Sequence, residues 1–145
     1  MSECLGLADL LLIAEAVLGE SAERLARIVL IPGAESALAA PFARFDGVDF
    51  YDDPVERAAI CCSRIIRNHP FPDGNKRVGY ECMREMLERG GFPWPRPGAD
   101  AEEIADTVEG LAARTISERE FVGWVRSRVE LGRRLGAGRP DRSKA

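Results

Sequence analysis

Apolar residues recur with a helical period along most of the chain. The leucine-rich stretch 7–18 predicts one helix that ends at Gly19, and Ser21 begins a second, shorter helix. Pro32 and Gly33 then interrupt the pattern. The first part of the chain therefore predicts two helices followed by a break.

The character of the sequence changes over residues 40–51. Two short runs containing aromatic residues flank Asp46-Gly47, a dipeptide that favours the tight turn of a hairpin. We expect two short antiparallel strands about this turn. A hairpin of this size is barely stable alone and exposes unpaired backbone groups at its edges, so something must cover or use it.

A third helix is predicted to begin at Asp53. Asp53 is a good helix cap, Pro54 suits the first helical position, and Glu56 has the spacing of a capping box. The apolar residues expected on its buried face are Val55, Ala58, Ala59, Cys62 and Ile66.

Three more helices are predicted in the second half of the chain. The first follows a loop with two prolines, ends at Gly90, and buries Val78, Cys82, Met83, Met86 and Leu87. Asp100 with Glu103, and Ser117 with Glu120, have the spacing of helix starts. Their buried faces carry Ile104, Val108 and Leu111 in one helix, and Phe121, Trp124, Val125 and Val129 in the other.

These patterns predict an all-α fold, a bundle of about six helices with a small β-hairpin. With 145 residues, 46% hydrophobic and 30% charged, the chain fits one domain over residues 1–135. Residues 136–145 look like a basic, disordered tail.

Charge and composition reduce the number of function classes to consider. The net charge of −4 gives no reason to expect nucleic-acid binding. The apolar run 10–13 lies between Asp9 and Glu15 with no basic residue before it, so neither a signal peptide nor a membrane span is predicted, and we expect a cytoplasmic protein. The four cysteines lack metal-ligand spacing, which favours reduced, mostly buried thiols.

The residues that suggest chemistry lie in the loop 68–77. His69 and Phe71 each precede a proline, so the helix before them is expected to end near Asn68. Asp73, Gly74 and Asn75 accept tight-turn geometry, which can aim several backbone N–H groups at one point as the next helix begins. Such a point attracts anions.

Two cations follow in the first turn of that helix. Lys76 and Arg77 oppose the positive end of the helix dipole, at a cost of about 0.3–1 kcal/mol each, unless an anion such as phosphate binds there. The alternative is that Arg77 simply pairs with Glu81, four residues on.

The single histidine and the nearby carboxylate each have two interpretations. His69 is either a structural histidine or a general base that takes a proton from an attacking hydroxyl. Asp73 is either a plain helix cap or a ligand that holds Mg²⁺ on a nucleotide.

The loop resembles the signature of the Fic family, H-x-F-x-(D/E)-G-N-x-R. All of its fixed positions are filled, by His69, Phe71, Asp73, Gly74, Asn75 and Arg77. The likeness extends to the leucine-rich first helix, to residues 35–38 before the hairpin, and to the order of the helices.

The resemblance implies a helical fold with a hairpin flap and an enzyme that uses ATP with Mg²⁺. His69 would be the general base, Phe71 would anchor the loop in the core, and Asp73 would hold the metal. The residues expected to contact the phosphates are Gly74, Asn75, Lys76 and Arg77. The flap residues expected to pair with an extended target segment are Phe42, Ala43, Arg44 and Phe45.

Two positions depart from the adenylylating members of the family. Lys76 stands where they usually carry glycine, and Tyr80 where they usually carry a second arginine. Asn75-Lys76-Arg77 is similar to the death-on-curing (Doc) toxin branch, whose members transfer the terminal phosphate to a threonine of elongation factor Tu. The resemblance therefore implies a kinase that blocks translation, with adenylyltransferase or a non-catalytic anion-binding module as alternatives.

The resemblance also bears on restraint of the activity. Some Fic proteins carry an inhibitory helix of pattern (S/T)-x-x-x-E-(G/N), which has no match here, since Thr107 to Gly110 have the wrong spacing. We therefore expect a separate antitoxin as a partner.

Overall fold

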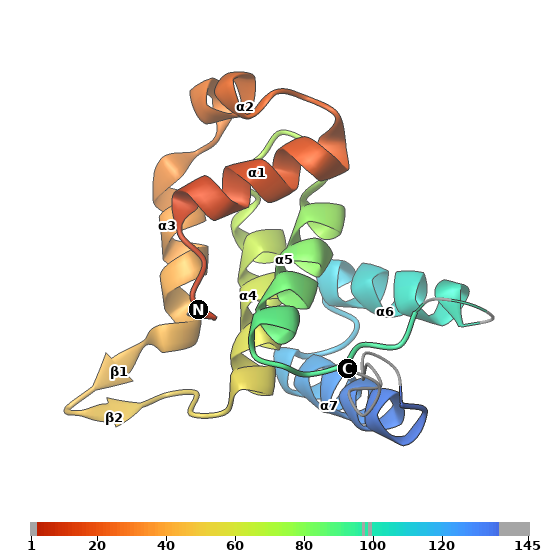
Figure 1. Ribbon diagram of the computed structural model, residues 1–145. Coiled ribbons are helices and arrows are strands. Elements are labelled where there is room, and N and C mark those ends of the chain that lie inside the picture. Colours follow the sequence, from red (N-terminus) through yellow and green to blue (C-terminus); the bar gives the residue numbers. More distant parts are fainter. Residues whose placement is uncertain (1–2, 97, 99, 137–145) are drawn as a thin grey trace, which may run out of the picture.

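The elements follow the hydrophobic pattern of the sequence closely. In the computed structural model (Figure 1), which describes residues 3–96, 98 and 100–136, these residues form seven α-helices, one 3₁₀ helix and one hairpin. The helices are α1 (Leu7–Leu18), α2 (Ala22–Ile28), α3 (Ile31–Ala39), α4 (Pro54–Asn68), α5 (Asn75–Arg89), α6 (Ala101–Ala113) and α7 (Glu118–Arg134). Between α3 and α4 lie the 3₁₀ helix η1 (Ala40–Phe42) and the strands β1 (Arg44–Phe45) and β2 (Val48–Asp49).

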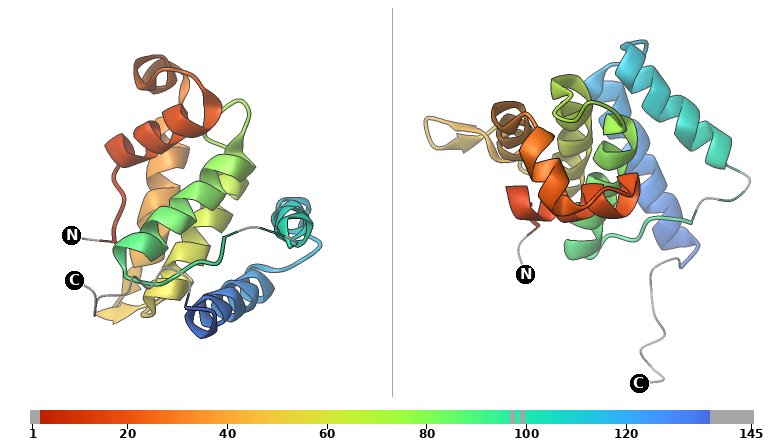
Figure 2. Two further views of the ribbon diagram at one scale, coloured as in Figure 1. Left: turned by 45° about the vertical axis from the view of Figure 1, so that its right-hand side comes forward. Right: turned by 90° about the horizontal axis from the view of Figure 1, so that it is seen from above.

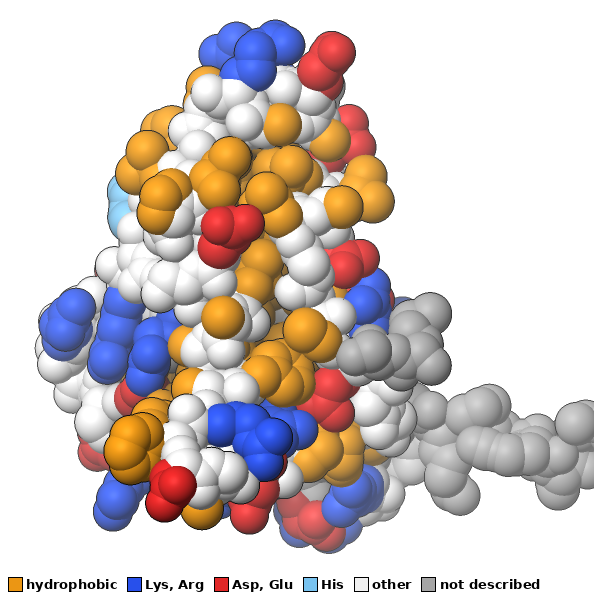
Figure 3. Space-filling view, turned by 90° about the vertical axis from the view of Figure 1, so that its left-hand side faces the viewer, with side chains coloured by type: hydrophobic (Ala, Val, Ile, Leu, Met, Phe, Trp, Pro, Cys, Tyr) orange, Lys and Arg blue, Asp and Glu red, His pale blue; other side chains and the backbone are white. Residues whose placement is uncertain are grey.

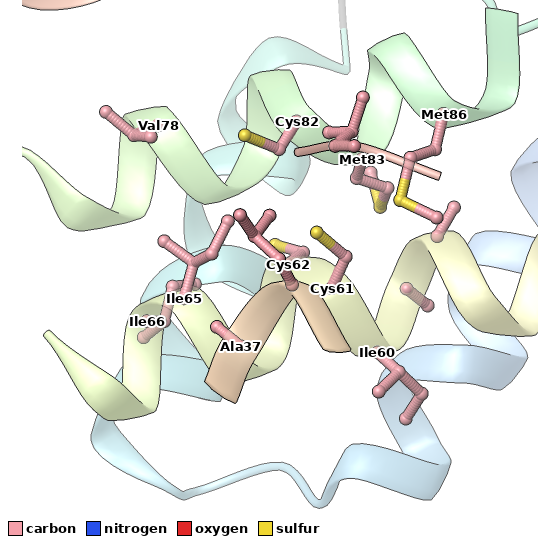
Figure 4. Packing of buried hydrophobic residues seen from close by; sticks show 14 of the residues in the cluster. Ala37, Ile60, Cys61, Cys62, Ile65, Ile66, Val78, Cys82, Met83 and Met86 are labelled. Carbon is pink, nitrogen blue, oxygen red and sulfur yellow. The ribbon is translucent and has the colours of Figure 1, made fainter. Parts of the chain in front are cut away.

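Helices α4 and α5 form the centre of the fold. Figures 1 and 2 show α1 to α3 on one side of this pair and α6 and α7 on the other. The buried side chains between the two helices, such as Ile65, Val78 and Met83, are fully shielded from solvent (Figure 4). A Cβ at Gly79 would lie 3.0 Å from the carbonyl oxygen of Cys62, so glycine permits this close crossing. All ten apolar residues predicted for the buried faces of these two helices lie in the core.

Helix α3 was not among the predicted helices, and its formation raises the count from about six to seven in the described chain. Pro32 falls in its first turn, where a backbone N–H has no partner within the helix and proline costs nothing. Ala34, Ala37 and Leu38 then recur at helical spacing and are buried. The interpretation of Pro32 as a break was therefore wrong, because its position relative to the helix start decides its effect.

The hairpin forms about the predicted turn, with shorter strands than expected. Asp46 and Gly47 both have positive φ, 55° and 78°, as a type I′ turn requires. Arg44 pairs with Asp49 in the antiparallel register. Phe42, expected to belong to the first strand, instead lies in η1.

The predicted helix starts are confirmed, with two differences in their capping contacts. Asp100 precedes α6 but its side chain makes no cap, because its carboxylate accepts a hydrogen bond from Arg128 instead. The Asp53 carboxylate accepts a hydrogen bond from the N–H of Val55 (3.0 Å), and Ser117 and Glu120 form a capping box. Glu56 closes no such box; its carboxylate lies 3.6 Å from the Arg126 guanidinium instead.

Glu118 fastens the beginning of α7 to α4. Its carboxylate accepts hydrogen bonds from the Ser63 hydroxyl and the Arg64 guanidinium, and lies 3.6 Å from Arg67. Burial alone would raise the pKa of Glu118, but the hydrogen bonds from Arg64 and Ser63 outweigh burial, and its pKa is lowered overall.

The cysteine thiols at the α4–α5 contact are buried, as expected from the composition. Burial raises the pKa of Cys61 to about 12 and the pKa values of Cys62 and Cys82 well above the ordinary value. These thiols are part of the buried packing between the two helices. Cys4 is exposed.

Two further expectations concern a membrane span and the C-terminal tail. No single helix in the described ranges is long and apolar enough to cross a membrane; α2 with Ile31–Phe42 meets that test only as a pair, bent by 102°. Apart from Gly136, the expected tail 136–145 lies outside the described residues.

Candidate active site

The loop between α4 and α5 begins with His69 in an unusual backbone conformation. His69 ends α4 in the left-handed region (φ 51°, ψ 54°), and its N–H donates to the carbonyl of Ile65 (3.0 Å). A non-glycine residue in this region is strained by about 1–2 kcal/mol, which surrounding contacts must offset. The imidazole is exposed and has no hydrogen bond to any described residue (pale blue in Figure 3).

Neighbouring segments fix the loop on both sides. The Pro70 carbonyl accepts a hydrogen bond from the N–H of Leu30 (2.8 Å), just before α3. The Asn68 side chain donates to the carbonyl of Gly33 inside α3 (3.0 Å). The loop that carries the histidine is therefore held against α3, the helix that the sequence pattern did not predict.

Phe71 and Asn75 hold the middle of the loop. Phe71 is 1% exposed and lies in the core. The Asn75 side chain, 4% exposed, donates to the carbonyl of Phe71 (2.8 Å) and accepts from its N–H (3.0 Å). The amide thus satisfies both backbone groups of the anchoring residue, a contact that the signature alone did not predict.

The first turn of α5 has the geometry of an anion site. Gly74 has φ 81°, and a Cβ there would lie 2.3 Å from Leu18 at the end of α1. The N–H of Val78 is the first to bond within the helix, to the Gly74 carbonyl. Residues 75–77 donate no backbone hydrogen bond within the described chain, and the first turn holds no acidic residue.

Lys76 and Arg77 point to opposite sides of this turn. The Lys76 ammonium lies 2.9 Å from the carboxylate of Glu109 on α6. The Arg77 guanidinium donates to the carbonyl of Val17 at the end of α1 (2.8 Å). The predicted alternative partner of Arg77, Glu81, accepts hydrogen bonds from Arg84 instead.

Asp73 lies at the surface next to this turn. One of its carboxylate oxygens accepts a hydrogen bond from the N–H of Gly74 (2.8 Å). Within the described chain no three histidine, cysteine or acidic residues gather as a metal site. One exposed carboxylate still fits Mg²⁺, which proteins often bind through one or two carboxylates together with substrate phosphates.

An apolar groove extends from the turn along α5. It has a volume of about 360 Å³, and its lining includes Lys76, Arg77, Tyr80, Ile104 and Val108. Because the Tyr80 hydroxyl accepts a hydrogen bond from the Trp94 indole (2.9 Å), the tyrosine ring is held at the wall of the groove.

The predicted flap residues have different environments. Phe42 packs against the core, with the Arg57 guanidinium 5.1 Å from its ring centre, whereas the Phe45 side chain is 73% exposed on the strand. Ala43 accepts the hydrogen bond of the Phe50 N–H (3.0 Å) at the base of the hairpin. Arg44 bonds across the hairpin to the carbonyl of Gly47 (2.8 Å).

Comparisons with known proteins find relatives that are similar to part of this chain. The protein adenylyltransferase fic-1 of Caenorhabditis elegans is 44% identical over 41 residues, which cover 28% of this chain and 8% of that protein. The protein adenylyltransferase Fic of Culex quinquefasciatus is 34% identical over 68 residues, covering 43% of this chain and 14% of that protein. The chain therefore spans only a small part of these relatives. No solved structure matches it significantly.

The family model extends much further along the chain. The model of the Fic/DOC family matches residues 4–87, from the segment before α1 almost to the end of α5. This range holds the exposed histidine, the buried anchor and the helix start with its free amides, and the chain belongs to the Fic/DOC family.

Proposed function

We propose that the chain transfers the terminal phosphate of a nucleoside triphosphate to a hydroxyl group of a target protein. The observation that carries this proposal is the start of α5. Three backbone N–H groups without partners in the described chain lie at the positive end of a 15-residue helix, in the turn that follows the exposed His69 loop. Phosphate is one of the anions that such a turn binds.

In this proposal His69 is the general base. Its imidazole is exposed and carries no competing hydrogen bond within the described residues, so it is accessible to a hydroxyl group of another protein. The hydroxyl proton passes to the imidazole as the oxygen attacks the phosphorus, and the bond from that phosphorus to the leaving phosphate oxygen breaks. The contacts at Asn68 and Pro70 keep the loop that carries the ring in place during this step.

Asp73 is the residue that would hold Mg²⁺. The oxygen that does not bond to Gly74 is available to a cation from the exposed side of the turn. When bound, Mg²⁺ supplies positive charge to the phosphate oxygens. The nearby Arg77 keeps further N–H groups for phosphate while its Nη2 bonds to Val17.

The groove beside α5 favours transfer of the terminal phosphate over transfer of adenylate. The groove leads away from the amide site past Lys76 and Tyr80, and its walls are mostly apolar. An apolar groove of about 360 Å³ suits a nucleoside better than a charged triphosphate tail. With the nucleoside in the groove, the terminal phosphate of the nucleotide lies toward the amides and His69.

Adenylyl transfer is the second candidate, and the relatives favour it. The matching proteins of C. elegans and C. quinquefasciatus are both named protein adenylyltransferases. The nucleotide would then bind in the reverse direction, with its terminal phosphates near Tyr80. A tyrosine that already bonds to Trp94 gives those phosphates no positive charge.

The proposed target reaches the site along the hairpin, whose strand edges accept an extended segment by backbone pairing. Following the resemblance to the death-on-curing branch, we propose elongation factor Tu as the target and a separate antitoxin as a partner. Both would place the protein in the cytoplasm.

Labelled nucleotide distinguishes the candidates. The chain is incubated with Mg²⁺, purified elongation factor Tu and a bacterial extract, with ATP labelled at the α or the γ phosphate in separate reactions. Label from the γ position on a protein supports phosphate transfer. Label from the α position identifies an adenylyltransferase, and nucleotide binding without labelled protein contradicts both transfer reactions. The His69→Ala variant is the control for label that does not come from this site.

A further inference from the structure

The hairpin has few contacts of its own with the helical body. Each strand is two residues long, and the side chains of Phe45, Val48 and Phe50 are 73%, 65% and 60% exposed. Figures 1 and 2 show the hairpin projecting from the bundle between α3 and α4. Because so short a hairpin is marginal by itself, its position depends on the contacts at its base.

One side chain of α4 contacts both ends of the hairpin. The Arg57 guanidinium donates from Nε to the carbonyl of Tyr51 (2.8 Å) and from Nη2 to the Asp49 carboxylate (3.3 Å), both on the outgoing side. On the incoming side it lies 5.1 Å from the ring centre of Phe42. Its third nitrogen is 3.8 Å from the carboxylate of Glu3.

The contact continues into the hairpin through Asp49. One oxygen of this carboxylate lies 3.3 Å from Arg57, and the other lies 2.8 Å from the Nε of Arg44. Arg44 also donates to the Gly47 carbonyl at the turn (2.8 Å). A continuous set of polar contacts thus joins α4 to the tip of the hairpin.

Arg57 is suited to this role by its burial and shape. Its side chain is only 18% exposed, so water competes weakly for its hydrogen bonds. A planar guanidinium donates in two directions while its face packs on an aromatic ring, which the ammonium of lysine does not do. Among the described residues, no residue of the His69 loop or of the α5 amide site makes a hydrogen bond or an ion pair with Arg57.

We infer that Arg57 is a positioning residue for target recognition, holding the hairpin in the orientation that presents the target hydroxyl to His69. This inference rests on the proposed function. If the hairpin moves freely, only a fraction of the molecules hold it in the competent position, and the apparent affinity for the target falls by that fraction. The KM for the target rises, whereas nucleotide affinity and kcat at saturating target stay close to those of the wild type.

The test compares Arg57→Ala with Arg57→Lys in the full chain. Kinetics are measured with purified elongation factor Tu and γ-labelled ATP, nucleotide affinity by calorimetry, and hairpin mobility by hydrogen exchange at the Phe50 amide. We expect Arg57→Ala to raise the KM roughly tenfold or more, because hydrogen bonds of a charged group are lost, and to accelerate the exchange. Arg57→Lys should restore part of both effects. Arg126→Ala is the matched control, since this exposed arginine pairs with Asp53 and Glu56 at the start of α4 and has no ion pair with the described hairpin residues.

A second variant keeps the inference testable if Arg57→Ala fails to fold. Asp49→Asn leaves the core untouched and weakens the link between Arg57 and Arg44, so it should change KM and exchange in the same direction by less. Unchanged exchange and unchanged KM in both variants would overturn the inference, as would a fall in kcat alone. If the wild type transfers no label to elongation factor Tu, the proposed function fails for that target. Hydrogen exchange then still decides whether Arg57 holds the hairpin.

Discussion

Replacing Asn75 by alanine tests whether the family signature preserves a structural contact as well as a phosphate contact. The Asn75 side chain bonds to both the N–H and the carbonyl of Phe71, and all these groups are buried. Alanine would leave two buried backbone groups without partners, at about 1–3 kcal/mol each. Because alanine has a higher helix propensity than asparagine, it stabilises the first turn of α5 by at most about 0.5 kcal/mol. We therefore expect Asn75→Ala to destabilise the chain by about 2–5 kcal/mol.

Thermal unfolding followed by circular dichroism measures this effect. For a chain of 145 residues the expected loss lowers the Tm by about 5–20 °C. Asn68→Ala is the matched control, because its side chain makes one hydrogen bond, to Gly33, in a less buried setting. Its Tm should fall by only about 2–6 °C.

The outcome separates two roles of the same side chain. A variant Asn75→Ala whose Tm falls no further than that of Asn68→Ala would refute the reasoning, since the reciprocal contact would then contribute little. If such a stable variant also lost nucleotide affinity, the Asn75 amide would be a direct phosphate ligand. A large loss of stability with retained affinity of the folded fraction would assign it to the loop alone.

Four further predictions concern the site and its support. His69→Ala should lower kcat by about 10²–10⁴ and leave nucleotide affinity nearly unchanged, as measured by turnover and calorimetry; an unchanged rate would remove the general-base assignment. Lys76→Gly should shift the label on the target from the γ toward the α phosphate, and an unchanged product means that this lysine does not set nucleotide orientation. Arg77→Ala should weaken nucleotide binding and also lower the Tm, because the Val17 carbonyl loses its partner; retained binding and turnover would contradict its phosphate role. Because the pKa of Glu118 is lowered on folding, its stabilising contribution is present above pH 4.5 and is lost as the pH falls through the depressed value. Glu118→Gln should therefore flatten the pH dependence of unfolding in that acidic range, and identical pH profiles would count against the ion pair.

Local signals in the sequence predicted most of the fold. The end of α1 at Gly19, the start of α4 at Asp53 and the turn at Asp46-Gly47 each depend on residues within a few positions of one another. Helix α3 escaped prediction because proline has opposite effects in the first turn and in the interior of a helix. Hydrophobic periodicity alone did not show whether Pro32 lies in the first turn of a helix or interrupts one.

The sequence predicted which residues make up the site, but it did not predict their backbone conformation or the contacts that hold them. The signature brought His69, Asp73 and Gly74 into one loop, and the structure places them there. The contacts that hold the loop come from far along the chain, as in the packing of Leu18 against Gly74. The left-handed backbone of His69 was also outside the expectation, because the following proline only disfavours right-handed helix and does not choose among the remaining conformations.

These long-range contacts change the argument for a phosphate site. In the sequence, Lys76 and Arg77 indicated a bound anion because cations at the start of a helix oppose the positive end of its dipole. In the structure each cation already faces an acceptor within the chain, a carboxylate on α6 for Lys76 and the negative end of α1 for Arg77. Helix α1 has no basic residue in its own last turn, so Arg77 supplies the positive charge that this end lacks. The case for phosphate therefore depends on the free amides of residues 75–77, and nucleotide must compete with Glu109 for Lys76. That competition involves an exposed ion pair worth at most about 1 kcal/mol, which a multiply charged phosphate chain displaces readily.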